Sequence, residues 1–266
     1  MTLTQSTSER SALSEELLNK VPQITLAFWV IKIMATTVGE TAADFLIFNL
    51  GFGLVATSAI MALLLAAFLA FQLRLREYVP VSYWLVVVFV SVVGTLVSDY
   101  MADDLGISLL TTTIVFAAAL AVTFVAWYAN ERTLSIHSIT TRRRELFYWA
   151  AILFTFALGT AAGDLVSEQF GLGYLISALM FGTFIAAVYA AYKAGADAVL
   201  TFWIAYILTR PFGASIGDLL SQPTNNGGLG LGTTGTSVAF LAVIAAMVAY
   251  LSVTKKDRIE TAASAN

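Results

Sequence analysis

Four aspartates recur at a fixed place in the sequence, each following a tryptophan and a glycine. The aspartate lies fifteen residues after the tryptophan and five after the glycine in Trp29–Gly39–Asp44, Trp84–Gly94–Asp99, Trp149–Gly159–Asp164 and Trp203–Gly213–Asp218. The aspartates are 55, 65 and 54 residues apart. Such spacing indicates an internal repeat. Four carboxylates placed at one level of a repeat structure predict a ring that holds a positive ligand.

Three further ionisable residues lie inside apolar segments: Lys32, Glu40 and Arg210. Charges in a membrane are costly unless they pair or contact water, and they are candidate functional residues by default. We expect Arg210 to pair with Glu40 or Asp44, and Lys32 to pair with another carboxylate, so that both balance charge. Pro211 predicts a kink that frees a backbone carbonyl for a polar partner.

Steps of four residues from each tryptophan describe one side of a helix. They select Lys32, Thr36, Glu40 and Asp44; Val87, Ser91, Thr95 and Asp99; Ile152, Phe156, Thr160 and Asp164; and Tyr206, Arg210, Ala214 and Asp218. Thr36, Ser91, Thr95 and Thr160 are therefore expected to line a pathway that leads to the aspartates. The repeat glycines predict close approach between these helices, and the four tryptophans are expected to be packing anchors.

The composition predicts an all-α polytopic membrane protein. The chain is 59% hydrophobic and 12% charged, with a mean hydropathy of +0.83, and a soluble domain has about one quarter charged residues. Runs of about 20 apolar residues predict eight spans, at residues 23–46, 52–73, 81–103, 108–128, 146–168, 172–193, 198–221 and 234–254. The net charge of −3 does not indicate nucleic-acid binding.

The spans divide the chain into two pairs of repeats. We expect a cytosolic tail at 1–20, with a short helix around Leu13, Leu17 and Leu18. Repeats 1 and 2 occupy 21–130, a basic cytosolic linker 131–145, repeats 3 and 4 146–254, and a second cytosolic tail 255–266.

Twelve of the fourteen lysines and arginines lie at the termini or between repeats. The positive-inside rule then places both termini and every between-repeat loop in the cytoplasm. The four odd-numbered spans run in the same direction, so we expect parallel repeats with the odd helices central and the even helices peripheral. Each aspartate lies roughly 30 Å along its span, near the outer boundary. Because the helix dipole opposes a carboxylate at a helix C-terminus, the ring needs a cation, a helix break or protonation.

The repeated sequences GETAAD, GTLVSD, GTAAGD and GASIGD, with YW or FW upstream and an LGxG turn downstream, resemble a bacterial inner-membrane family. The family consists of tandem repeats of unknown function, often labelled membrane-anchored proteins. The resemblance covers about residues 20 to 255 and implies an eight-helix multi-pass protein of the inner membrane. It implies no activity.

The leading hypothesis is a transporter or permeation pathway for a small, hard cation. Asp44, Asp99, Asp164 and Asp218 with Glu40 would bind the ion, and Lys32 or Glu40 would exchange a coupling proton. The chain has no cysteine and one histidine, His137 in the polar linker, and oxygen ligands favour Mn²⁺, Mg²⁺, Ca²⁺ or protons. A divalent ion is the one cofactor that the residues suggest.

The alternative is a non-transporting scaffold, sensor or assembly protein whose buried charges form structural ion pairs. No enzyme motif is present, so we expect no enzymatic activity, and a lipid-modifying enzyme ranks third. The bilayer is the expected partner. Substrate, direction, coupling and oligomeric state stay open.

Overall fold

The chain forms a bundle of long helices in the computed structural model, which describes residues 19–258. The short helix expected around Leu13 to Leu18 lies outside the described residues. Within them there is no strand, and the long helices are α2 Leu26–Asp44, α3 Leu54–Gln72, α4 Pro80–Asp99, α5 Leu109–Glu131, α6 Arg142–Asp164, α7 Gly173–Lys193, α8 Ala198–Ser221 and α9 Thr233–Thr254. The predicted all-α architecture of eight helices is confirmed.

Most of these helices are long and apolar enough to cross a membrane. Seven meet both conditions, and α2, which carries Lys32, Glu40 and Asp44, is not among the seven. In the most apolar windows of α4, α6 and α8, 61–72% of residues are buried, against 11–28% in α3, α5, α7 and α9. Predicted spans 3, 5 and 7 correspond to α4, α6 and α8, and predicted spans 2, 4, 6 and 8 correspond to α3, α5, α7 and α9. The odd-numbered spans are therefore central and the even-numbered spans peripheral, as expected.

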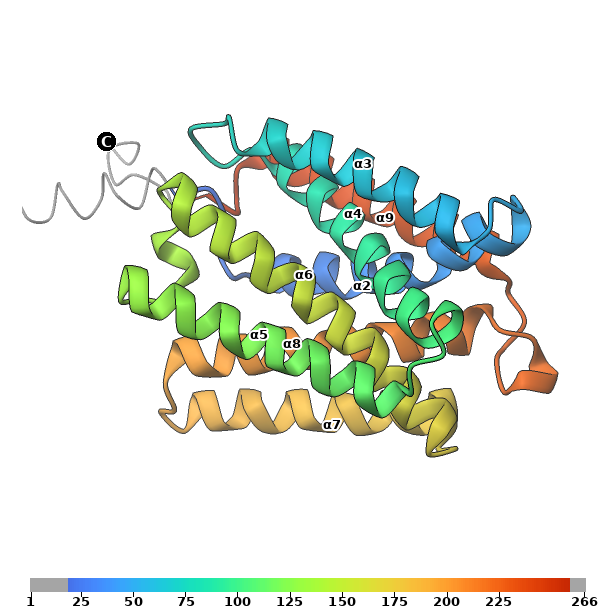
Figure 1. Cartoon of the computed structure of the whole chain (residues 1–266). Coiled ribbons are helices and arrows are strands. Elements are labelled where there is room, and N and C mark those ends of the chain that lie inside the picture. The colour runs from blue at the N-terminus through green and yellow to red at the C-terminus, as the bar shows by residue number, and fades with distance from the viewer. Residues whose placement is uncertain (1–18, 259–266) are drawn as a thin grey trace, which may run out of the picture.

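The four central helices close into a ring. Helix α2 packs on α4, α4 on α6, α6 on α8, and α8 returns to α2. Each outer helix covers the central helix of the following repeat: α3 packs on α4, α5 on α6, α7 on α8, and α9 on α2. Figure 1 shows the long helices side by side. The outer helix of every repeat thus packs on the next repeat around the ring.

The repeat glycines allow the central helices to approach each other. A Cβ built on Gly39 would overlap Ser91, and the same relation joins Gly94 to Phe156, Gly159 to Arg210, and Gly213 to Thr36. Each partner lies seven residues after its own tryptophan. The close approach predicted from the small residues therefore occurs at all four junctions.

The first three aspartates are the last residues of their α-helices, but the helical backbone continues past them. A π-helical turn directly follows each of them, at η1 Phe45–Asn49, η2 Tyr100–Asp104 and η4 Leu165–Gln169. In the fourth repeat α8 itself continues to Ser221, and the 3₁₀ turn η5 Thr224–Asn226 follows. The helical hydrogen bonding continues past the carboxylates. The negative end of the helix dipole, which was expected to disfavour them, therefore lies about one turn beyond them.

The start of the third central helix differs from that expected. Helix α6 begins at Arg142, inside the predicted linker 131–145, because the Thr141 side chain caps it by accepting a hydrogen bond from the Arg144 amide at 3.3 Å. The linker between α5 and α6 is therefore shorter, with the 3₁₀ turn η3 Ile136–Ser138 in it. Helix α8 is continuous through Pro211.

Candidate cation site and the buried charges on the bundle axis

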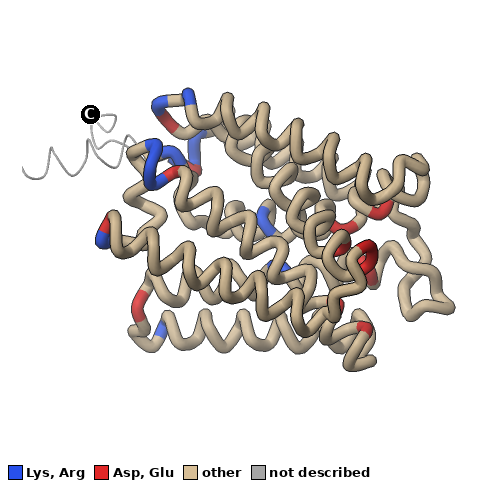
Figure 2. The backbone as a smooth tube through the Cα atoms, viewed as in Figure 1, with Lys and Arg blue, Asp and Glu red and all other residues tan. Residues whose placement is uncertain are grey.

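An acidic cavity of about 560 Å³ lies at one end of the central helices. Its lining contains eight carboxylate side chains and neither lysine nor arginine: Glu40, Asp44, Asp99, Asp103, Asp104, Asp164, Glu168 and Asp218. Figure 2 shows a group of acidic residues without basic neighbours at this end, and most of the basic residues, interspersed with other acidic residues, at the opposite end. The predicted site aspartates thus border one cavity, together with Glu40.

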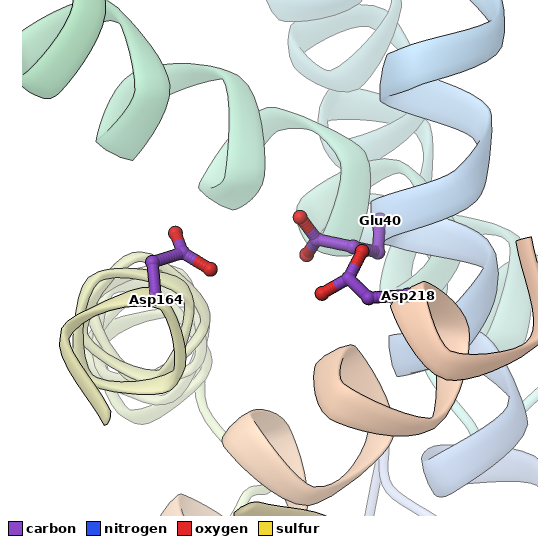
Figure 3. A group of neighbouring side chains, drawn as sticks. All are labelled: Glu40, Asp164 and Asp218. Atoms are coloured by element: carbon purple, nitrogen blue, oxygen red, sulfur yellow. The ribbon is translucent and has the colours of Figure 1, made fainter. Parts of the chain in front are cut away.

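Three of the carboxylates converge more closely than the others. One oxygen each of Glu40, Asp164 and Asp218 lie within 4.8 Å of one another. Figure 3 shows these side chains coming from three different helices toward a common centre. Glu40 and Asp218 are each 7% exposed. We call Glu40, Asp164 and Asp218 the carboxylate triad.

Asp44 and Asp99 border the cavity without joining the carboxylate triad. Gln222 donates a hydrogen bond from Nε2 to Oδ2 of Asp44 at 3.4 Å. The set that converges therefore differs from the four-aspartate ring expected from the repeat, because Glu40 lies one helical turn before Asp44 on α2.

Three acidic residues of the lining, Asp103, Asp104 and Glu168, were not among the predicted site residues. One more step of four along each stripe would have found two of them. That step selects Phe48, Asp103, Glu168 and Gln222, and all four line the cavity. The steps of four were stopped at the aspartates, although the predicted spans 81–103 and 146–168 already reached Asp103 and Glu168.

Arg210 contacts Glu40 of the cavity lining, lies outside the lining itself and is fully buried. Its Nη2 donates a hydrogen bond to Oε2 of Glu40 at 3.2 Å. This is one of the two ion pairs that were expected for Arg210. Its other acceptors are Thr160 Oγ1 at 2.7 Å, Thr36 O at 3.1 Å, Phe156 O at 3.3 Å and the hydroxyl of Thr95. These acceptors come from all three other central helices, so Arg210 occupies the bundle axis.

The four hydroxyl residues expected to line a pathway lie outside the cavity lining. Thr36, Ser91, Thr95 and Thr160 are fully buried. Thr95 also donates to Oε2 of Glu40 at 3.4 Å, and Ser91 packs against Gly39. Because the Arg210 side chain fills the space between the helices at this level, the hydroxyls contact arginine or helix backbone.

Lys32 lies on the same axis, further from the cavity. Its Nζ donates to Tyr206 O at 3.0 Å and to Thr209 Oγ1 at 2.5 Å. The Tyr206 ring centroid is 4.4 Å away and that of Phe156 5.1 Å. No described carboxylate lies within ion-pair distance of Lys32, so the expected pairing with a carboxylate is not formed. A carbonyl dipole and aromatic faces take its place.

Aromatic side chains close the axis beyond Lys32. The residue before each repeat tryptophan is buried and aromatic: Phe28, Tyr83, Tyr148 and Phe202. The hydroxyls of Tyr83 and Tyr148 lie 2.5 Å apart, and the rings of Phe28 and Phe202 have centroids 6.1 Å apart. We call these four residues the aromatic layer. The repeat tryptophans pack around it; for example, the ring centroids of Trp84 and Phe28 are 5.6 Å apart.

The chain matches one protein family in four successive segments. The family is described as "Repeat of Unknown Function (DUF347)", and its matches cover residues 27–78, 82–133, 147–195 and 201–257. Each matched segment covers most of one central helix and the whole of one outer helix. Neither a curated protein nor a solved structure matches the chain significantly.

Proposed function

Because the chain belongs to the DUF347 repeat family, whose description gives no activity, we propose its function from the geometry of the cavity. The protein is a membrane transporter or permeation pathway for a small hard cation, and the carboxylate triad binds the ion. Mn²⁺, Mg²⁺ and Ca²⁺ are the ions whose oxygen-ligand preference fits these residues.

The observation that carries this proposal is the convergence of Glu40, Asp164 and Asp218. Ligand oxygens lie about 2.0–2.6 Å from such ions, so oxygens on opposite sides of one ion are roughly 4–5 Å apart. The oxygens of the triad lie within 4.8 Å of one another. Small rotations of the side chains therefore suffice to bind a divalent cation.

The rest of the cavity favours the entry of cations. Its five other carboxylates, Asp44, Asp99, Asp103, Asp104 and Glu168, surround the triad without a neutralising lysine or arginine in the lining. A cleft lined with one sign of charge raises the local concentration of counter-ions. The lining therefore concentrates cations at the mouth of the site.

We place the protein in the bacterial inner membrane with both termini in the cytoplasm. The segments that join α3 to α4 and α5 to α6 contain Arg74, Arg76 and Arg132. These segments lie at the end of the bundle opposite the cavity (Figure 1), and basic loops stay on the cytoplasmic side. The cavity then opens outward. Arg210, Lys32 and the aromatic layer close the axis toward the cytoplasm, so transport requires a second conformation in which they separate.

One observation favours a non-transporting sensor or scaffold instead. Arg210 has five acceptors and fills the axis, as expected of a charge that specifies helix packing. In this second candidate function the cavity binds a cation without releasing it to the other side.

Flux of Mn²⁺ into proteoliposomes tests the proposal. Asp99→Asn and Asp164→Asn each remove a cavity carboxylate and are expected to reduce flux. Asp197→Asn is the matched control, because Asp197 caps α8 far from the cavity and asparagine caps helices equally well. Undiminished flux in both cavity variants would refute the site. Mn²⁺ binding without flux in the wild type would favour the sensor.

A further inference from the structure

Glu40 has two roles that compete. Its Oε2 accepts a hydrogen bond from Arg210 Nη2 at 3.2 Å, and the same carboxyl group belongs to the carboxylate triad. A carboxylate that coordinates a cation loses most of its attraction for a neighbouring guanidinium, because the cation neutralises its charge. The ion pair with Arg210 and full coordination of a cation are therefore alternative states of Glu40.

Arg210 does not depend on Glu40 for its position. Two backbone carbonyls, Thr36 O and Phe156 O, and two hydroxyls, those of Thr95 and Thr160, accept the remaining hydrogen bonds of its guanidinium. All these acceptors are neutral and belong to the rigid central helices. The guanidinium therefore stays on the axis when Glu40 turns away from it.

Asp218, unlike Glu40, is a buried member of the triad that has no positive partner among the described residues. It is 7% exposed, and no described residue donates a hydrogen bond to its side chain. In Figure 3 its carboxylate points toward Glu40. A buried carboxylate is normally paired or hydrogen-bonded. Arg210 satisfies Glu40, whereas Asp218 has no such partner among the described residues and borders the cavity.

We propose that Arg210 is a built-in competitor of the transported cation: it holds Glu40 until an ion bound by Asp164 and Asp218 takes that carboxylate over. This inference rests on the proposed cation site. Arg210 then sets the affinity of the site, and its release from Glu40 reports ion binding to the helices on the axis. Arg210 also affects specificity, because a bound ion must interact with Glu40 more strongly than the guanidinium does.

The test measures Mn²⁺ binding to the purified full-length protein in detergent, by the loss of the electron paramagnetic resonance signal of free Mn²⁺. Arg210→Gln removes the competitor and is expected to tighten binding by about tenfold, within the usual range of coupling between sites. Lys32→Gln is the matched control. It removes an equally buried positive charge that does not contact Glu40, and binding should change by less than about threefold.

A double-variant cycle separates competition from a general effect of charge. In a Glu40→Gln background the competition is gone, so Arg210→Gln should tighten binding no more than Lys32→Gln does. If Arg210→Gln elutes as an aggregate in gel filtration, Arg210→Lys replaces it. Lysine keeps the charge but lacks the planar fork, so a smaller tightening is expected.

The outcomes distinguish the two proposals. Binding that Arg210→Gln and Lys32→Gln change equally would overturn the competition and leave the cation site standing. An equal effect of Arg210→Gln with and without Glu40 would do the same. Absence of Mn²⁺ binding in the wild type and all variants would refute the cation site itself.

Discussion

Gly159 on α6 and Arg210 on α8 are in direct contact: a Cβ on the glycine would overlap Cβ and Cγ of the arginine. The arginine reaches the bundle axis because the neighbouring helix has no side chain at this point. The same glycine in the other three repeats accommodates Ser91, Phe156 or Thr36. The same glycine contact therefore joins all four pairs of neighbouring central helices, and at one of them the contacting residue is the charged Arg210.

Gly159→Ala is expected to destabilise the protein by about 1–3 kcal/mol, because the added methyl group forces Arg210 or α8 to move. Gly163→Ala is the control on the same helix. Its Cβ would meet nothing closer than 3.6 Å, and alanine favours the helix in both variants. The midpoint of thermal unfolding in detergent compares them. Equal midpoints would contradict the packing argument.

The sequence predicted the central ring well because each repeat has its tryptophan, glycine and aspartate on one helical side. It could not predict which central helix each outer helix covers, because α3, α5, α7 and α9 are almost uniformly apolar. The partner of Lys32 was mispredicted for another reason. Spacing places residues along a helix but does not show that the Tyr206 carbonyl lies opposite Lys32. Asp103 and Glu168 were missed because the steps of four were stopped at the aspartates, although the pattern continues one step further, into the π-helical turns.

The buried ion pair of Lys20 and Glu145 is expected to be important for stability. Their side chains are 7% and 1% exposed, and the N–O distance is 2.7 Å. Among the described residues, Lys20→Met leaves Glu145 with only the Gln72 amide at 3.3 Å, and an unpaired buried charge costs about 3–5 kcal/mol. Arg143→Met breaks an exposed ion pair with Glu131 and should cost about 0–1 kcal/mol. Similar losses of thermal stability in the two variants would show that Glu145 finds another partner.

Asp257 predicts a dependence of stability on pH. Burial raises its pKa above the ordinary value of 3.8, although the hydrogen bond from Tyr78 and the charge of Arg258 lower it in part. The folded chain therefore binds this proton more tightly than the unfolded chain does. The resulting stabilisation is complete below pH 3.8 and is lost as the pH rises through the folded-state pKa.

Asp257→Asn keeps an acceptor for the Tyr78 hydroxyl, 2.6 Å from Oδ2 in the wild type, and removes the titration. The difference in unfolding midpoint, wild type minus variant, should decrease as the pH is raised from about 4 to 7. A constant difference would show that Asp257 does not titrate in this range.

The hydroxyl pair of Tyr83 and Tyr148 in the aromatic layer predicts non-additive substitutions. Both side chains are fully buried, and their oxygens lie 2.5 Å apart. Tyr148→Phe leaves the Tyr83 hydroxyl buried without a partner, which costs about 1–3 kcal/mol, whereas replacing both tyrosines by phenylalanine is close to neutral. Thermal unfolding of the two single variants and the double variant measures this coupling. A double variant less stable than either single variant would refute it.

The absence of cysteine from the sequence permits a direct test of the proposed orientation. Asn226 is exposed in η5, at the cavity end, and Arg76 is exposed in the loop between α3 and α4, at the basic end. Asn226→Cys is expected to react with a membrane-impermeant maleimide in intact cells. Arg76→Cys should react only after the membrane is permeabilised, because basic loops stay in the cytoplasm. The unsubstituted chain, which has no thiol, is the blank. The reverse labelling pattern would show that the protein has the opposite orientation. The acidic cavity would then open to the cytoplasm, and Arg210 would lie on the path by which cations leave the cell.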